Sequence, residues 1–179
     1  ATHPKHLAAE VVRHGADLGI ALDGDGDRLV MADAQGRVYD GDQLLYVIAM
    51  DAKRRGALSG GVVGTQMSNL GFEQALAREG IPLERAKVGD RYVLENMLAG
   101  GYNLGGEQSG HVILLDHATT GDGILTALAL LRVIVRRHEP VSLVSKVIHV
   151  LPQVLKPARV PEDKKQKAMD DKDLKAAIK

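Results

Sequence analysis

The sequence predicts an α/β fold: a three-layer α/β/α domain with a mainly parallel mixed sheet, preceded by a smaller strand–loop–strand unit and followed by the start of a C-terminal domain. Short apolar runs alternate with segments of helical periodicity over residues 40–150, the pattern of a sheet covered by helices on both faces. Before residue 40 the pattern is strand–loop–strand, and after residue 150 it becomes proline-containing and then lysine-rich. The predicted domains are therefore residues 1–39, 40–150 and 151–179.

The first 39 residues are predicted to form one helix and a small set of strands. Residues 6–14 have helical spacing, and two short apolar runs follow at 17–22 and 29–32. An Asp/Gly loop separates these runs, and a glycine-containing turn leads into a third short run at 38–39.

The central segment is predicted to contain helices between short strands. Asn69 is a suitable N-cap for the second helix, and Gly80 lies just beyond its end. The last helix has the strongest pattern, with Thr120 before it and Pro140 after it. The predicted helices cover residues 42–55, 69–78, 92–98 and 121–137, and the predicted strands cover 61–65, 82–88, 102–104 and 111–115.

The C-terminal residues differ in composition. Residues 151–160 combine apolar residues with prolines, which indicates a linker or an edge strand. Residues 162–179 are lysine-rich with helical periodicity and are predicted to be the first helix of a further domain. A first residue other than Met and an unfinished helical pattern at the end lead us to expect an internal fragment of a longer protein.

The composition disfavours several classes of function. The absence of cysteine excludes disulfides and thiolate metal sites. A formal net charge of zero and an aromatic content of 3% disfavour a nucleic-acid partner. No apolar stretch approaches the length of a membrane span, and no signal peptide opens the chain. We therefore expect a cytoplasmic protein without nucleic-acid or membrane partners.

Residues 23–28, DGDGDR, are the most informative segment. Asp23, Asp25 and Asp27 alternate with glycines, which let the backbone curl so that side chains spaced about 7 Å apart on an extended chain can converge. Converging carboxylates repel one another, and a hard divalent cation such as Mg²⁺, Mn²⁺ or Ca²⁺ relieves that repulsion. Arg28 beside such a site suits a phosphate oxygen. The alternatives are a polar turn and a salt bridge between Arg28 and one of the aspartates.

Two other loop types do not match this segment. A calcium EF-hand needs glycine at its sixth position and glutamate at its twelfth, where this chain has Arg28 and Ala34. A dinucleotide-binding fingerprint needs a third glycine where this chain has Leu29.

Residues 105–111, GGEQSGH, form a second polar loop after a short strand. The Glu107 carboxylate and the Ser109 hydroxyl suit sugar hydroxyls, and ligands bind at strand ends in α/β sheets. Ser109 directly precedes Gly110, so the segment is not a nucleophile elbow. A glycine-rich turn without a ligand is the alternative.

A third cluster lies at a strand-to-helix junction. Lys87, Asp90 and Arg91 combine two cations and a carboxylate where the amides of a helix N-terminus favour anions. A capped helix that starts at Asp90 explains the same spacing.

Together, these segments resemble the α-D-phosphohexomutase superfamily, and most closely its phosphoglucosamine mutases. The resemblance covers nearly the whole chain and implies a four-domain enzyme. Residues 1–39 would be the end of domain two, which is similar to domain three, residues 40–150 would be domain three, and residues 151–179 would be the start of domain four. The matching stretches are DLGIALDGDGDRL (17–29), VVGTQMSN (62–69), VGDRYV (88–93), GGEQSGH (105–111) and TGDGIL (120–125).

The resemblance implies roles for the site residues. Asp23, Asp25 and Asp27 would hold Mg²⁺ against a phosphoserine of domain one, and Arg28 would contact the same phosphate. His111 would lie beside the reacting sugar. The implied substrate contacts are Glu107, Ser109, His111, Lys87, Asp90 and Arg91.

The resemblance also implies a reaction, the interconversion of glucosamine 6-phosphate and glucosamine 1-phosphate. Glucosamine 1,6-bisphosphate would be intermediate and activator, and the product would serve UDP-N-acetylglucosamine and peptidoglycan precursor synthesis. Whether the full-length relative is a homodimer stays open. This chain contains neither the family's Ser-His-Asn-Pro segment nor its Arg-x-Ser-Gly-Thr-Glu-type phosphate loop, so the chain alone is expected to be inactive.

Three alternatives remain. A phosphomannomutase or phosphoglucomutase would share the aspartate loop, although Gln108 and the VGDRYV stretch favour the amino sugar by likeness. A divalent-ion or sugar-phosphate binding module would need no catalysis. An aspartyl-phosphate phosphatase would need a nucleophilic aspartate that a metal-bound loop does not leave free.

Overall fold

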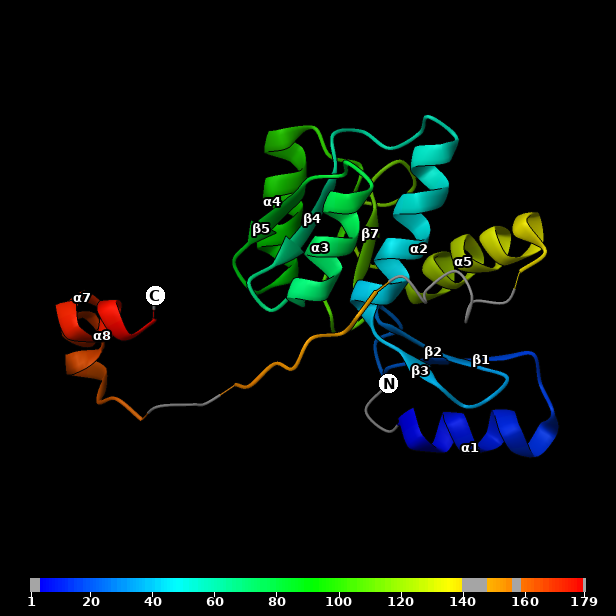
Figure 1. Cartoon of the computed structure of the whole chain (residues 1–179), viewed down its shortest axis with the longest axis horizontal. Helices are drawn as coiled ribbons and strands as arrows, with labels where there is room; N and C mark the ends of the chain where they lie inside the picture. Colours follow the sequence, from blue (N-terminus) through cyan, green and yellow to red (C-terminus); the bar gives the residue numbers. More distant parts are fainter. Residues whose placement is uncertain (1–3, 140–147, 156–158, 179) are drawn as a thin grey trace.

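The structure, a computed structural model, describes residues 4–139, 148–155 and 159–178. Figure 1 shows a small N-terminal unit beside a larger α/β domain, with the C-terminal helices lying apart from both. The strands form a three-stranded sheet in the N-terminal unit and a four-stranded sheet in the α/β domain. No helix within these ranges is long and apolar enough to cross a membrane.

The N-terminal unit is a helix on an antiparallel sheet, as the strand–loop–strand pattern predicted. Leu22 pairs with Leu29, so the aspartate loop closes a hairpin. A Cβ on Gly19 would overlap the Val11 side chain, and the glycine therefore lets the helix approach the sheet closely. The elements are α1 (Pro4–His14), β1 (Leu18–Leu22), β2 (Leu29–Asp33) and β3 (Val38–Tyr39).

The α/β domain contains all the helices and strands predicted for it, with small shifts at their ends. The largest shift concerns the strand expected at residues 102–104. The Tyr102 amide instead bonds the Met97 carbonyl, because Gly101 is left-handed (φ 70°) and ends the preceding helix there. The elements are α2 (Gly41–Arg54), β4 (Val62–Thr65), α3 (Leu70–Arg78), β5 (Leu83–Ala86), α4 (Asp90–Gly100), β6 (Leu104–Gly106), β7 (Val112–Leu114) and α5 (Gly123–Arg137).

The sheet of this domain is mixed and mainly parallel, which confirms the predicted fold class. Its strand order is β5-β4-β6-β7, with β4 parallel to both β5 and β6, and β7 antiparallel to β6. Helices α2 and α3 pack together and cover one face, and α4 packs against β4, β5 and β6 from the other. Helix α5 packs on α2 and β7 and also contacts β1 and β2, so it joins the N-terminal unit to the domain.

Each face of the sheet has its own hydrophobic core. The larger core lies under α2, α3 and α5 and includes the fully buried Leu44, Phe72 and Leu130. It extends into the N-terminal unit through Leu29 and Met31. The smaller core lies under α4 and contains Val63, Ala86, Val93, Met97 and Ile113.

Side-chain caps set the starts of the helices. Asp40 and Gln43 form a capping box on α2, and Asn69 caps α3 as predicted. For α5 the expected start was too early. Its N-cap is Asp122, whose carboxylate accepts a hydrogen bond from the Leu125 amide (2.9 Å), and not Thr120. Pro140 lies outside the described residues.

The C-terminal region departs from the prediction of a single helix. A short 3-10 turn, η1 (Glu162–Lys164), leads into α7 (Lys165–Asp170) and then α8 (Lys172–Ile178). Asp171 is extended between them, and its carboxylate accepts hydrogen bonds from the Asp173 and Leu174 amides, which starts a new helix.

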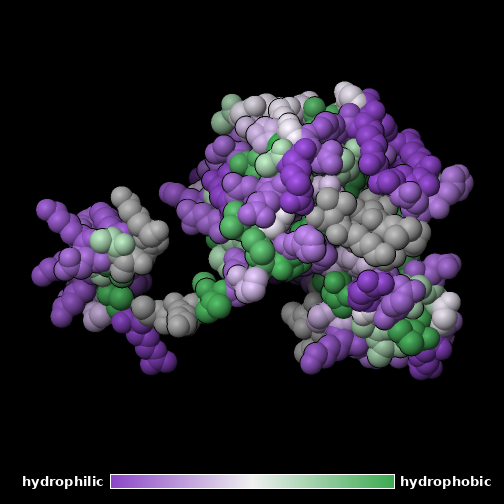
Figure 2. Space-filling view, viewed as in Figure 1, coloured by the Kyte–Doolittle hydropathy of each residue, from purple (hydrophilic) through white to green (hydrophobic). Residues whose placement is uncertain are grey.

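The described residues of 148–155 form no strand, so a linker, not an edge strand, fits this segment. Val150, Val154 and Leu155 are exposed along it, and Figure 2 shows this hydrophobic surface between the domain and the mostly hydrophilic C-terminal helices.

A buried carboxylate lies at the start of α2. Asp42 is 1% exposed, and its Oδ2 accepts a hydrogen bond from the Asn69 amide (2.7 Å). Oδ1 has no partner among the described residues. Burial, together with the charge of Asp40, raises the pKa of Asp42 to about 6.

Replacing Asp42 with asparagine is expected to remove a pH dependence of stability. Between pH values near 3.8 and 6, Asp42 is protonated in the folded chain and ionised in the unfolded chain. The free energy of unfolding therefore falls by roughly 3 kcal/mol as pH rises through this window, and is flat above it. Urea unfolding from pH 4 to 7.5 measures this slope. Asp42→Asn should flatten it and stabilise the chain at pH 7, whereas Asp17→Asn at an exposed position should keep the wild-type profile.

Candidate functional site

The predicted loops meet at one edge of the four-stranded sheet. The parallel strands β4, β5 and β6 all end at this edge, and the antiparallel β7 begins there. The segment after β5 (87–89) and the loop between β6 and β7 (107–111) therefore lie on the same side of the domain. This is the edge at which open α/β sheets bind ligands.

The aspartate loop of the N-terminal unit is joined to this edge through the backbone. Arg28 and His111 form an antiparallel bridge, and the Leu29 amide donates to the Gly110 carbonyl (3.0 Å). Gly110 has φ 97°, and a Cβ there would overlap the Leu29 carbonyl oxygen, so only glycine allows the two loops to come this close. The two segments that sequence analysis identified independently thus form one site.

Asp23 organises the aspartate loop from within. Its Oδ1 accepts hydrogen bonds from the amides of Gly26 (3.1 Å) and Arg28 (3.3 Å). Partial desolvation raises the pKa of the Asp23 carboxyl, but the Arg28 amide, the Asp27 side chain and the charge of Arg28 outweigh it and leave the pKa lowered. Asp23 is therefore ionised at neutral pH and lies next to Asp27.

Asp27 and Asp25 differ in their surroundings. Asp27 is half-buried, and its Oδ1 is buried without a hydrogen-bond partner among the described residues. Asp25 is exposed at the tip of the loop. No three His, Asp or Glu side chains in the described part of the chain converge in metal-binding geometry.

The loop nevertheless fits a hard divalent cation in its chemistry. Its possible metal ligands are carboxylate oxygens only, and two of the three carboxylates are adjacent. The buried Oδ1 of Asp27 accepts no hydrogen bond from the described residues, and a cation would compensate its charge. For Asp25 to become the third ligand, its exposed side chain would have to rotate toward Asp23 and Asp27.

Arg28 forms an ion pair with an aspartate of its own loop, which is the alternative to a phosphate contact that the sequence left open. Its Nε lies 3.7 Å from Asp23 Oδ2, and the side chain is 49% exposed. The guanidinium therefore keeps donors available to a ligand above the aspartate loop.

The second loop is a tight turn held by its own backbone. The Gly110 amide donates to the Glu107 carbonyl (3.0 Å), and the Glu107 amide donates to the His111 carbonyl (2.8 Å). The Glu107 carboxylate accepts a hydrogen bond from the Gly89 amide (3.1 Å), which ties the third cluster to this loop. Gln108 donates to Asp40 (3.3 Å), and Ser109 is exposed.

His111 connects the two loops through its side chain as well. The ring is buried (2% exposed), and its Nε2 lies 3.7 Å from Asp27 Oδ2. Nδ1 is buried without a partner among the described residues. Gly121 packs directly against the ring, where any side chain would overlap it.

Part of the third cluster shares a pocket with His111. This pocket of about 250 Å³ lies between α4 and the segment after β7, and Asp90, Arg91 and His111 line it. Lys87 is exposed and does not line it; its Nζ lies 5.7 Å from the centre of the Tyr92 ring. Helix α4 starts at Asp90, with Gly89 as its N-cap and no side-chain cap.

The sequence analysis missed two polar residues of this pocket. Thr119 and Thr120 also line it and add hydroxyl groups to its wall. The available signal was the TGDGIL stretch, which begins at Thr120.

Comparisons with known proteins agree on one family. Residues 40–150 match the model of the phosphoglucomutase/phosphomannomutase α/β/α domain III. A phosphoglucosamine mutase of Bradyrhizobium diazoefficiens is 54% identical over 178 residues, which cover 99% of this chain and 39% of that protein. A phosphoglucosamine mutase of an Azoarcus species is 56% identical over 161 residues, 90% of this chain and 36% of that protein. The chain thus spans well under half the length of these relatives.

A solved structure shows the same likeness in three dimensions. A phosphoglucomutase/phosphomannomutase family protein of Burkholderia thailandensis superposes with a TM-score of 0.73 at 26% identity. The match covers 87% of this chain and 34% of that one.

Proposed function

Because this chain belongs to the phosphoglucomutase/phosphomannomutase family, we propose that it carries the metal loop and the sugar loop of a phosphoglucosamine mutase. The whole enzyme interconverts glucosamine 6-phosphate and glucosamine 1-phosphate in the cytoplasm, as a step toward amino-sugar nucleotides and cell-wall precursors. The relatives of highest identity reported above carry the name of that activity.

The backbone junction between the two loops carries the proposal. The Leu29–Gly110 hydrogen bond and the Arg28–His111 bridge hold a carboxylate cluster and a sugar-type polar loop side by side. A phosphate held at the aspartate loop would therefore lie next to a sugar held at the second loop. Phosphoryl transfer depends on such positioning of donor and acceptor.

The aspartate loop would act electrostatically. Asp23, Asp25 and Asp27 would hold Mg²⁺, which neutralises charge on a transferring phosphoryl group when bound. Arg28 would bind oxygens of the same group through its planar donors. The phosphoserine that donates and regains the phosphoryl group would come from another part of the whole enzyme.

The second loop would hold and orient the sugar. Glu107 and Ser109 would bind sugar hydroxyls, and His111, beside Asp27, would lie next to the reacting oxygen. Asp90 and Arg91 in the neighbouring pocket, and Lys87 at its margin, would contribute further substrate contacts. Glucosamine 1,6-bisphosphate would form when the phosphoserine phosphorylates the bound sugar. It would then reorient in the site and return its other phosphoryl group to the serine.

The full-length mutase is expected to prefer glucosamine 6-phosphate. With Mg²⁺ and the matching bisphosphate as activator, its kcat/KM for glucosamine 6-phosphate should exceed that for glucose and mannose 6-phosphates by about tenfold or more. Equal or better use of the neutral sugars would favour a phosphomannomutase or phosphoglucomutase. No turnover of any of the three would favour a sugar-phosphate binding module.

The 179-residue chain is expected to bind Mg²⁺ through the aspartate loop. Loss of a residue that only holds a metal ligand in place typically weakens metal binding by about tenfold or more. Loss of a carboxylate that itself binds Mg²⁺ should weaken binding at least as much. Calorimetric titration of Mg²⁺ into the wild type and Asp27→Asn measures this difference. Asp17→Asn, outside the loop, should bind as the wild type does, and unchanged binding by Asp27→Asn would contradict the assignment.

A further inference from the structure

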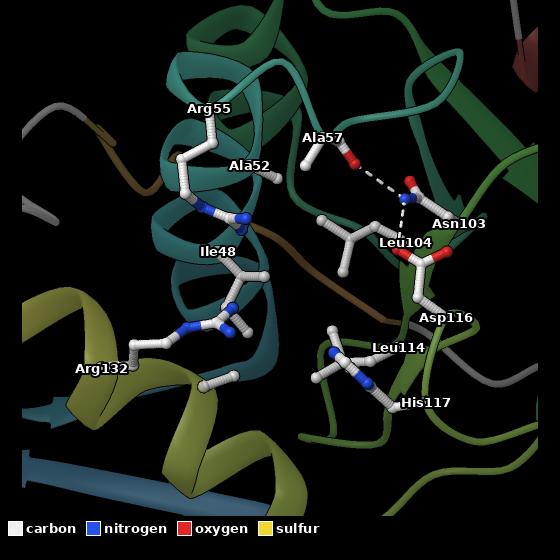
Figure 3. A pocket seen from close by; sticks show the side chains of 11 residues that line it. Ile48, Ala52, Arg55, Ala57, Asn103, Leu104, Leu114, Asp116, His117 and Arg132 are labelled. Carbon is white, nitrogen blue, oxygen red and sulfur yellow. Dashed lines mark hydrogen bonds between the residues drawn. The ribbon is translucent and has the colours of Figure 1, made fainter.

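A second pocket lies at the opposite edge of the sheet from the candidate site. It has a volume of about 230 Å³ and is formed by α2, α5, the start of β6 and the segment after β7. Ile48 and Leu114 form part of its apolar wall. Arg55, Arg132 and His117 line it as well, and Figure 3 shows their side chains directed toward the same hollow from three different elements.

The cationic groups of this pocket are only partly neutralised. Arg55 donates to Asp51 (2.7 Å) through Nε, and its side chain is 37% exposed, so the rest of its guanidinium stays available. Arg132 has no hydrogen-bond or ion-pair partner in the described part of the chain. Arg55 and Arg132 line the same hollow. Two guanidinium groups in one pocket repel each other, and a bound anion relieves this repulsion.

The opposite side of the pocket is polar and fixed. Asn103 donates one hydrogen bond to the Ala57 carbonyl and one to the Asp116 carboxylate, each 2.8 Å (Figure 3). The Asp116 carboxylate is therefore held beside the hollow, as an acceptor for hydroxyl groups. The negative charge of Asp116 also disfavours an anionic group on that side of a ligand.

We propose that this pocket binds a small phosphate monoester with a short hydroxylated carbon chain. The phosphate would lie between the guanidinium groups of Arg55 and Arg132, which present planar donors that match phosphate oxygens. The carbon chain would contact Ile48 and Leu114, and its hydroxyl would donate to Asp116. The volume is below the range of about 300–1,000 Å³ that is typical of drug-sized ligands, so a molecule of few heavy atoms fits.

The pocket is separate from the candidate site. Its elements α2 and α5 begin at the other edge, where the Gly41 amide donates to the Gln108 carbonyl and the Gly123 amide donates to the Gly26 carbonyl (each 2.9 Å). The inference rests on this pocket alone and not on the proposed function.

Nuclear magnetic resonance titration of the 179-residue chain tests the proposal. Glycerol 3-phosphate is added at constant ionic strength, with glycerol and inorganic phosphate in parallel titrations. Saturable shifts are expected at the Arg132 side chain and at the Asn103 and His117 amides. Glycerol 3-phosphate should bind more tightly than inorganic phosphate, and glycerol should not bind.

Matched variants separate this pocket from the rest of the surface. Arg132→Gln removes an exposed charge and should weaken binding by about tenfold. Arg54→Gln removes an exposed arginine of α2 that does not line the pocket, and should bind as the wild type does.

Several results would overturn the proposal. They are the absence of saturable shifts at the pocket, equal weakening by Arg132→Gln and Arg54→Gln, and shifts confined to residues 107–111. Equal affinity for inorganic phosphate and glycerol 3-phosphate would overturn the assignment of the carbon chain.

Discussion

Replacing Gly110 with alanine is expected to destabilise the chain by roughly 2–4 kcal/mol and to separate the two loops of the candidate site. Gly110 has φ 97°, which strains any other residue, and the new Cβ would overlap the backbone of Leu29. Backbone atoms within a strand cannot move aside as a flexible side chain can. The hydrogen bond between the Leu29 amide and the Gly110 carbonyl should therefore be lost.

A second glycine offers a matched control. Gly101 is also left-handed (φ 70°), but a Cβ built there would have no contact within 4 Å among the residues that the structure describes. Gly101→Ala should therefore cost only the backbone strain, about 1 kcal/mol. Urea unfolding of both variants gives the two free energies. Equal losses would show that the close approach to Leu29 contributes nothing, and would remove the junction as the feature that joins the loops.

Replacing Arg28 with alanine is expected to lower kcat of the full-length mutase by about 10²–10³-fold, with a smaller change in KM. The guanidinium would stabilise charge that develops on the transferring phosphoryl group, so its loss should be felt mainly in the transition state. Arg28→Lys should recover only part of the rate, because an ammonium group lacks the planar pair of donors.

The control for this measurement is Arg13, another ion-paired arginine of the N-terminal unit. Arg13 pairs with Glu10 on the exposed surface of α1, away from both loops. Arg13→Ala should leave kcat and KM unchanged. If Arg28→Ala also kept full activity, its pairing with Asp23 would be structural, and the phosphate-binding role would be wrong.

Local sequence signals predicted most of the secondary structure. Helical and strand periodicities need only neighbouring residues, and Asn69 caps α3 as its side-chain chemistry suggested. The errors lie where two local signals compete. Thr120 and Asp122 are both good capping residues, and the backbone geometry selects Asp122. Asp171 sits within a lysine-rich helical pattern, yet its carboxylate starts a new helix there.

Residue types and their spacing are enough to predict the chemistry of the candidate site. Alternating Asp and Gly before Arg28 indicate a cation and a phosphate, and the polar loop at 105–111 indicates a sugar, because these inferences depend only on residue type and spacing. They do not depend on where the loops lie. The family likeness extends the same residues to a reaction.

The proximity of these two loops is visible only in the folded chain. The Leu29–Gly110 hydrogen bond and the approach of His111 to Asp27 join residues far apart in the chain. No local periodicity encodes such contacts, since they follow from the strand order and from the packing of α5 on both sheets. The same packing brings Arg55, Arg132 and His117 to the opposite edge, where nothing in their sequence spacing indicates a common pocket.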